Sequence, residues 1–180
     1  YWKLEPQKDV AILQVGNTPS RIAAIFSGQV DGGLINPTDV GRVMSSGCCV
    51  QLSDLGDVDI PYARFGVTAT GGFLKSRPDT ARRVMEAFVD GIHYYKTHAD
   101  EAVAALLARG VEPKSAREVY QKVADSYRMR PDPEIISIKG VLDSLPDEKA
   151  KRTAPESLID NAPWQTVAKS GLVERLYGKR

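Results

Sequence analysis

The chain has 180 residues with 24 basic and 23 acidic side chains, and 42% of its residues are hydrophobic. This is the composition of an ordinary globular protein with one core or two small lobes. The formal net charge of +1 argues against a nucleic-acid-binding protein, whose surface should be clearly basic. No apolar run approaches the length of a membrane span. The sequence starts at Tyr1 without a methionine or a signal-peptide pattern, so we expect a fragment or a processed product.

The first part of the chain predicts a parallel βαβ unit, and therefore an α/β fold. Residues 9–16 and 31–35 are short apolar runs typical of buried strands, and helical signals lie between them. Thr18 can cap this helix, Pro19 suits its first position and Gly28 ends it. Two strands joined by a single helix form a parallel pair in one sheet.

The α/β pattern continues for one more helix and strand, and a mainly helical region follows. A weaker helix over 38–46 leads to a third apolar strand over 48–52. The polar segment 54–61 contains glycine and proline and is the best candidate for a hinge. A further strand is expected over 62–70. Later apolar spacing and breakers predict helices over 78–97, 100–109, 115–127, 134–145 and 164–169, with a charged loop over 146–155.

The two cysteines of the chain, Cys48 and Cys49, are adjacent. Neighbouring Cα atoms lie about 3.8 Å apart, below the usual disulfide span of about 4.4–6.8 Å, so a vicinal disulfide would be strained. Adjacent residues of a strand also point to opposite faces. We therefore interpret both cysteines as small buried hydrophobic residues of a strand. Zinc is not expected, because the ligand spacing of zinc sites is absent.

Several segments, taken in order along the chain, carry a family pattern. They are Gln14–Asn17, Arg21–Ala24, Ser27–Gly32, Phe73–Asp79, Ala87–Ile92 and Leu158–Asn161. Together they resemble the C-terminal part of the periplasmic solute-binding proteins of ABC importers. The most similar group handles aliphatic sulfonates, nitrate, taurine and pyrimidine precursors of thiamine.

The resemblance implies the type II periplasmic-binding-protein fold, in which two α/β lobes enclose a ligand cleft. Residues 1–59 would form the later part of the second lobe, in the order βαβαβ. Residues 60–180 would supply the crossover strand and the mainly helical C-terminal part of the first lobe. The N-terminal portion of the fold would be lacking. An incomplete sheet with exposed edges predicts self-association of the chain.

Polar residues gather where the predicted strands end. Gly16, Asn17 and Thr18 lie where a strand meets a helix N-terminus, whose N–H groups and dipole suit an anion. The alternative is a plain helix cap. Asn36 follows the next strand, and its amide can bond a ligand or form an Asx turn before Pro37. Because ligands bind beyond the carboxyl ends of parallel strands, we predict that Gly16, Asn17, Thr18 and Asn36 line a small-molecule site.

Three further candidates fall on the predicted crossover strand, beside the cleft. Arg64 can pair with an anion through two hydrogen bonds, and Tyr62 or Phe65 can stack on a ring. A surface salt bridge and two core aromatics are the alternatives. The two histidines, His93 and His98, lack metal-binding spacing, and no Ser-His-Asp or Cys-His arrangement is recognisable. We therefore predict no catalytic residue, no metal and no cofactor.

The resemblance implies an extracytoplasmic, periplasmic solute-binding component of an ABC importer. Such a protein closes by hinge motion on a small anionic or heteroaromatic solute. It then presents the solute, without turnover, to permease subunits in the membrane, and no nucleic-acid partner is expected. Two alternatives are an enzyme similar to the thiamine pyrimidine synthase and the ligand-sensing domain of a transcription regulator. The synthase branch carries a cysteine-rich motif on the crossover strand, where this sequence has no cysteine.

Overall fold

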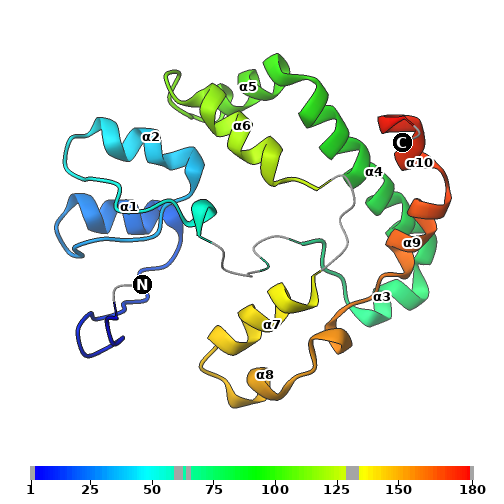
Figure 1. Ribbon diagram of the computed structural model, residues 1–180, viewed down its shortest axis with the longest axis horizontal. Coiled ribbons are helices and arrows are strands. Elements are labelled where there is room, and N and C mark those ends of the chain that lie inside the picture. Colours follow the sequence, from blue (N-terminus) through cyan, green and yellow to red (C-terminus); the bar gives the residue numbers. More distant parts are fainter. Residues whose placement is uncertain (1–2, 59–62, 64–65, 129–133, 179–180) are drawn as a thin grey trace. The chain divides into compact units, whose positions relative to one another are not determined.

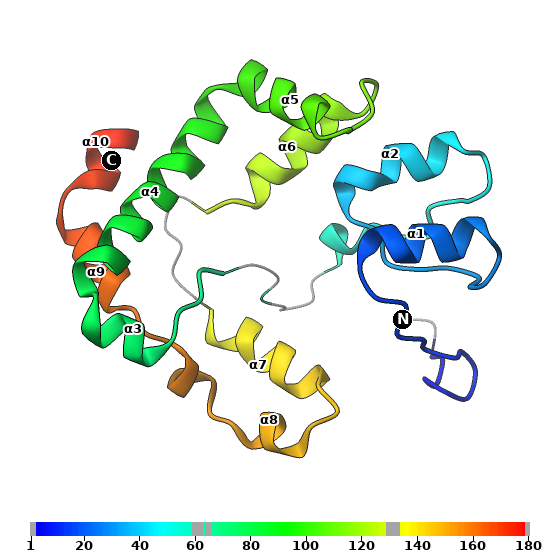
Figure 2. The same ribbon diagram turned by 180° about the vertical axis from the view of Figure 1, so that it is seen from behind.

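The computed structural model describes residues 3–58, 63, 66–128 and 134–178. Helices make up 61% of the residues that the structure describes, and Figures 1 and 2 show them from opposite sides. The chain divides into two compact units, which are described separately. The first unit holds Tyr1–Leu52 and Ala104–Val119, and the second holds Ser53–Val103 and Tyr120–Arg180.

The helices of the described residues follow one another along the chain with short connections. They are α1 (Thr18–Phe26), α2 (Pro37–Ser45), η1 (Leu55–Asp57), α3 (Gly71–Ser76), α4 (Pro78–Thr97), α5 (Ala99–Ala108), α6 (Ala116–Ser126), α7 (Ile135–Ser144), α8 (Glu148–Arg152), η2 (Pro155–Leu158), α9 (Ala162–Lys169) and α10 (Leu172–Tyr177). None of the helices within the described ranges is both long and apolar enough to cross a membrane.

The predicted α/β, type II binding-protein fold is wrong for this chain, because the described residues form no sheet. Strand pairing among them is limited to an isolated bridge between Pro6 and Val10. The apolar runs predicted as buried strands are instead exposed: Ile12 is 60%, Leu34 64% and Leu52 84% exposed. A strand is stable only when its backbone groups and side chains meet those of neighbouring strands. Within the described residues these runs find no such neighbours.

The predicted helices agree better with the structure. The helix predicted over 78–97 coincides with α4, and the predictions for α1, α2, α5, α6, α7 and α9 overlap the observed helices. Helices α3, α8 and α10 were not predicted, and α8 lies in the segment expected to be a charged loop. The predicted lobe boundary after Asp59 stays a prediction.

In the first unit, α2 packs closely against the loop that follows α5. A Cβ added at Gly41 would lie 2.5 Å from Ser115 Oγ and 3.1 Å from Glu112 Oε2, so a larger residue there would displace the loop. The Ser45 hydroxyl, on the same helix, donates to the Glu112 carboxylate at 2.7 Å. These contacts hold α2 against a segment 67 residues further along the chain.

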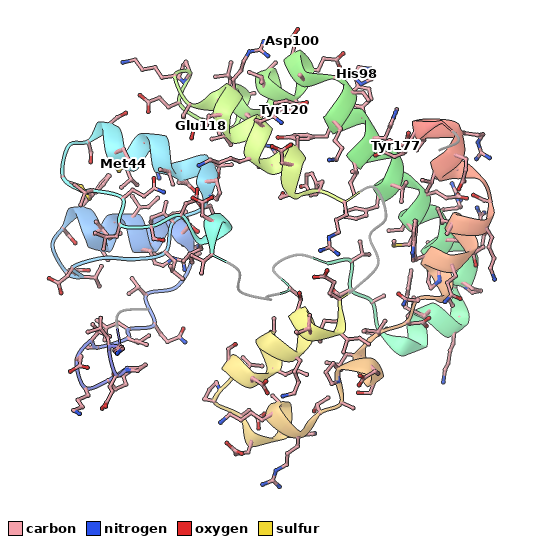
Figure 3. All side chains as sticks on the ribbon, in the orientation of Figure 1. Met44, His98, Asp100, Glu118, Tyr120 and Tyr177 are labelled. Carbon is pink, nitrogen blue, oxygen red and sulfur yellow. A yellow bond between two sulfur atoms is a disulfide. The ribbon has the colours of Figure 1, made fainter. Side chains whose placement is uncertain are left out.

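In the second unit, a hydrophobic core lies between α4, α9 and α10, which adjoin one another in both ribbon views (Figures 1 and 2). Val89 of α4 and Val167 of α9 are completely buried, and Trp164 lies with them. Tyr177 of α10 is labelled in Figure 3. Its ring meets that of His93 edge to face with the centroids 4.8 Å apart, which joins α10 to α4. Burial raises the pKa of the Tyr177 hydroxyl.

Tyrosines and one lysine join α4 to the C-terminal half of α6, again within the second unit. The ring centroid of Tyr95 lies 5.3 Å from that of Tyr120 and 5.8 Å from that of Tyr127. The Tyr120 hydroxyl donates to the Lys96 carbonyl oxygen at 3.1 Å, and the Lys96 ammonium donates to the Ala124 carbonyl oxygen at 2.5 Å. These bonds satisfy polar groups of both helices while the rings bury apolar surface.

We predict that exposed apolar side chains of the first unit make the chain self-associate, since apolar patches favour association. Leu52 is the most exposed of the large hydrophobic residues described. The substitution Leu52→Lys should lower the average mass measured by light scattering. The matched change Gln29→Lys adds the same charge at an exposed polar position and should leave that mass unchanged. A monodisperse monomer of the unmodified chain would contradict the prediction.

A second prediction concerns the ion pair that joins η1 to α6. Lys122 donates to Asp54 at 2.8 Å and the Gly56 N–H donates to Asp54 at 2.9 Å. These bonds, the first above all, hold the pKa of Asp54 below its usual range. A lowered folded-state pKa means that the stabilisation is present above the unfolded pKa and is lost as pH falls through the folded one. The substitution Asp54→Asn should therefore lower the free energy of unfolding at neutral pH, by at most about 1 kcal/mol because the pair is partly exposed.

Urea unfolding at pH 7 and at about pH 3 measures this difference. The effect of Asp54→Asn should shrink at the lower pH, which lies below the ordinary carboxyl pKa of about 3.9 and so inside the range where the stabilisation is being lost. The change Asp31→Asn, at an exposed position, should have little effect at either pH. An equal loss at both pH values for Asp54→Asn would show that the ion pair is not its cause.

Candidate functional site

The N-terminus of α1 is built by Asn17 rather than by Thr18, which corrects the predicted cap. Asn17 has an extended backbone, and its Oδ1 accepts hydrogen bonds from the Ser20 N–H at 3.1 Å and the Ser20 hydroxyl at 2.9 Å. Pro19 lies in the first turn, where its missing N–H costs no hydrogen bond. Gly16, with φ of +94°, provides the turn that leads into the cap.

Thr18 is released from capping, and its hydroxyl oxygen joins two other side chains. The side-chain amide of Asn36 donates to Thr18 Oγ1 at 3.0 Å, and the Arg21 guanidinium donates to the same oxygen at 2.9 Å. Thr18 is only 8% exposed, and the two residues that donate to it are half-buried. A hydroxyl oxygen has two lone pairs and can accept both bonds. We call Asn17, Thr18, Arg21 and Asn36 the N-terminal site.

The chain after α1 returns along the helix, and this return brings Asn36 to Thr18. Gly28, with φ of +70°, ends the helix, and the next two N–H groups both donate to the Ala24 carbonyl oxygen. A Cβ added at Gly33 would lie 3.3 Å from Ile25 Cδ1, so the returning segment passes close over α1. The chain therefore starts α2 beside the start of α1, as both ribbon views show (Figures 1 and 2).

The electrostatics of the N-terminal site favour a negative charge. The first N–H groups of a helix lack partners within the helix, and its dipole is positive at this end. The first turn of α1 contains no acidic residue, whereas Asp39 in the first turn of α2 pairs with Arg42 at 3.6 Å. The ion pairs of the described residues do not include Arg21. A guanidinium beside two helix N-termini can bind an oxyanion.

Arg21 is the residue of this site that we did not select from the sequence. Its Nε is buried and has no hydrogen-bond partner among the described residues, although its Nη2 binds Thr18. A buried donor without a partner costs free energy, and a ligand oxygen can supply the missing bond. The sequence did contain a signal for this contact, because Arg21 follows Thr18 by three residues and residues at that spacing lie on one face of a helix.

The remaining predicted site residues divide into two groups. Asn17, Thr18 and Asn36 are brought together, with Gly16 next to them in the turn. Tyr62, Arg64 and Phe65 lie outside the described residues, so their role stays a prediction.

The family of the chain can be stated from its sequence pattern. Residues 6–102 match the family described as NMT1/THI5 like. The chain belongs to this family. The NMT1/THI5-like family includes both solute-binding proteins and synthase-like members. No curated protein and no solved structure matches the chain.

Every residue of the N-terminal site lies inside the part of the chain that matches the NMT1/THI5-like family. The described residues contain no group of three or more His, Cys, Asp or Glu side chains placed to hold a metal ion. The first unit also contains a pocket of about 580 Å³, which is lined by Arg42, Ser45, Leu107, Gly110, Val111, Glu112 and Pro113. Its acidic Glu112 already binds Ser45, so this pocket is less suited to an anion than the N-terminal site.

We predict that the substitution Thr18→Val lowers the free energy of unfolding by about 1–3 kcal/mol, because two half-buried donors lose the acceptor that they share. The change Thr18→Ser keeps the oxygen and removes one methyl group, so it should cost only about 1 kcal/mol or less. Urea unfolding of both variants measures the difference. Equal losses would mean that methyl packing, and not the pair of hydrogen bonds, holds the two helix N-termini together.

Proposed function

We infer that the chain is the solute-binding component of an ABC importer and that its N-terminal site binds a small oxyanion without turnover. A sulfonate, nitrate or carboxylate has the charge and the acceptor oxygens that this site requires. Membership of a family with solute-binding members supports the proposal. A receptor of this kind acts outside the cytoplasm and delivers its solute to permease subunits in the membrane.

One observation carries the proposal: Thr18 Oγ1 accepts from both Asn36 and Arg21, so two helix N-termini and a guanidinium meet at one place. A structural cap would need only Asn17, whose side chain satisfies the first turn of α1 by itself. Asn36 lies at the N-cap of α2, yet its side chain makes no capping bond to that helix. An unused cap costs about 1 kcal/mol, which suggests that Asn36 is held for another purpose.

The oxyanion would be bound by hydrogen bonds and not by charge alone. The Arg21 Nε supplies a donor that has no partner among the described residues, and the positive ends of the α1 and α2 dipoles add to its attraction for an anion. Hydrogen bonds from a charged donor to a charged acceptor are about twice as strong as neutral ones. The site contains no acid–base side chain that could activate the Thr18 hydroxyl as a nucleophile, since its other members are a guanidinium and two amides. Binding without chemistry is therefore the role that these residues fit best.

We predict that an anion from a panel of alkyl sulfonates, taurine, nitrate, bicarbonate and aromatic acids stabilises the chain. A ligand at about 100 times its dissociation constant adds about 2.7 kcal/mol to the free energy of unfolding, which a thermal-shift assay detects. The substitution Arg21→Gln should weaken binding about tenfold or more, because a charged donor is lost. The change Arg83→Gln removes the same charge from an exposed position on α4 and should leave the affinity unchanged.

Three outcomes would contradict the proposal in different ways. Equal affinities of the Arg21→Gln and Arg83→Gln variants would remove the N-terminal site but leave a binding protein. Stabilisation by pyrimidines and not by anions would change the solute class. Conversion of a bound compound into product, or uptake of iron by the chain, would favour a synthase-like member of the family.

A further inference from the structure

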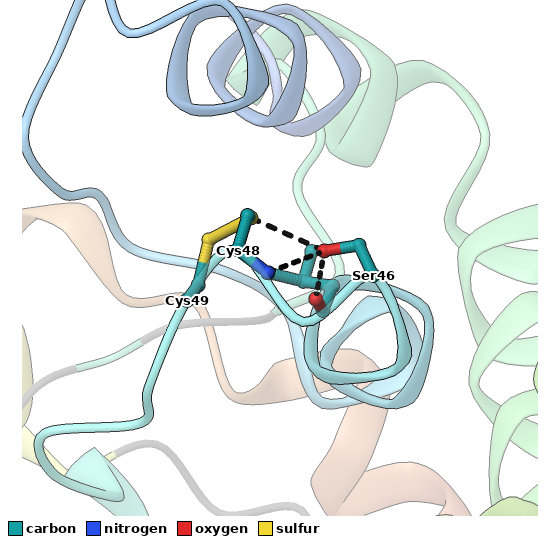
Figure 4. The surroundings of a disulfide bond; sticks show 4 residues. Ser46, Cys48 and Cys49 are labelled. Atoms are coloured by element: carbon teal, nitrogen blue, oxygen red, sulfur yellow. Dashed lines mark hydrogen bonds between the residues drawn. A yellow bond between two sulfur atoms is a disulfide. The ribbon is translucent and has the colours of Figure 1, made fainter.

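The adjacent cysteines form a disulfide, which overturns their interpretation as buried hydrophobic residues of a strand. Cys48 and Cys49 are bonded to each other with their Cα atoms 3.8 Å apart, and they lie in the segment that follows α2 (Figure 4). Cys48 is exposed and Cys49 is half-buried. The burial that would favour two inert thiols is therefore absent at Cys48.

We propose that the Cys48–Cys49 bond is a reversible exchange site for small thiols, separate in function from the N-terminal site. The chain has two cysteines in all, and none of them is free. A bond that is opened here has no third sulfur in the chain with which to exchange. Reoxidation within one chain therefore returns the same pair, which is what a reversible site needs.

A small thiol can reach this bond because the turn before it is open. Gly47, with φ of +70°, makes the turn between α2 and Cys48, and a Cβ added there would meet no atom within 4 Å. Ser46 and Cys48 on either side of it are both exposed. Disulfide exchange requires the attacking sulfur to approach one sulfur of the bond, so access decides where it starts. Because Cys48 is the exposed residue of the pair, we expect the small thiol to attack Cys48 Sγ.

Ser46 provides a hydrogen-bonding partner for the opened form. Its Oγ lies 2.6 Å from the Val43 carbonyl oxygen and 3.1 Å from Cys48 Sγ, and the Cys48 N–H donates to it at 3.4 Å (Figure 4). The hydroxyl has one proton for these two acceptors. A thiolate at Cys48 is a stronger acceptor than a disulfide sulfur, so the proton can turn toward it without movement of the backbone.

The exchange takes place in two balanced steps. The thiolate of a small thiol attacks Cys48 Sγ, a mixed disulfide forms, and the electron pair of the broken bond leaves on Cys49, which takes a proton from water. A second small thiolate attacks the sulfur of the bound small molecule and releases Cys48 as a thiolate beside the Ser46 hydroxyl. The net reaction consumes two small thiols and yields one small disulfide and the protein dithiol. The reverse reaction uses the small disulfide as the oxidant.

The test uses the whole folded chain, glutathione as the small thiol, and N-ethylmaleimide labelling read by mass spectrometry. Without glutathione we expect no label, and after glutathione two labels, one for each cysteine of the chain. Addition of glutathione disulfide should restore the unlabelled form. Labels on the untreated chain would overturn the proposal, because the pair would not be bonded. Labels that appear only after urea is added would also overturn it, because the bond would be inaccessible.

Two sets of variants test the assigned roles of the residues. With glutathione disulfide, the Cys49→Ser chain should form its adduct on Cys48 faster than the Cys48→Ser chain forms one on Cys49. The substitution Ser46→Ala should slow labelling of the reduced chain roughly fivefold, the size of one ordinary hydrogen bond. Ser27→Ala is the matched control, because Ser27 donates to the Ala24 carbonyl oxygen at the end of α1 and has no cysteine beside it. Equal adduct rates would show that Cys48 is not the preferred point of attack. Equal effects of the two serine changes would show that Ser46 does not stabilise the opened form.

Discussion

The hydroxyl oxygen of Thr18 is the point on which the arrangement of the first unit depends. It is shielded from water, and it accepts from a side chain of its own helix and from the residue that starts the next helix. Replacing this buried hydroxyl by an apolar group removes the acceptor that Arg21 and Asn36 share. The segment between α1 and α2 must therefore close on α1, and the two positive helix ends must lie together. The electrostatic character of the N-terminal site follows from this constraint.

The helices could be predicted from the sequence because their signals are local. A cap, a proline in the first turn and a glycine with positive φ define α1, and apolar spacing defines α4 over its full length. The strands could not be predicted in the same way. A short apolar run has the same sequence whether or not a neighbouring strand is present. Val50 and Leu52 therefore looked like a buried strand, although they are 76% and 84% exposed.

The candidate site was predicted in part, but for a different structural reason. Thr18 and Asn36 were expected to meet because parallel strands end at one edge of a sheet. They do meet, but the returning segment beside α1 brings them together without a sheet. Arg21 was missed because its role depends on where Asn36 arrives, which no local pattern specifies. The disulfide was missed because the exposure of Cys48 depends on the absence of a strand there.

Helices α1 and α2 have similar boundaries, and one difference between them bears on function. Each has nine residues, an asparagine at the N-cap, a proline in the first turn, a serine at the C-cap and a following glycine with φ of +70°. Asn17 caps its own helix, whereas Asn36 turns its amide to Thr18 and leaves its helix without a side-chain cap. The residues that follow the two caps differ, since Pro37 follows Asn36 directly whereas Thr18 stands between Asn17 and Pro19. The contact of Asn36 with Thr18 gathers amide, hydroxyl and guanidinium groups at one place, as recognition of an oxyanion requires.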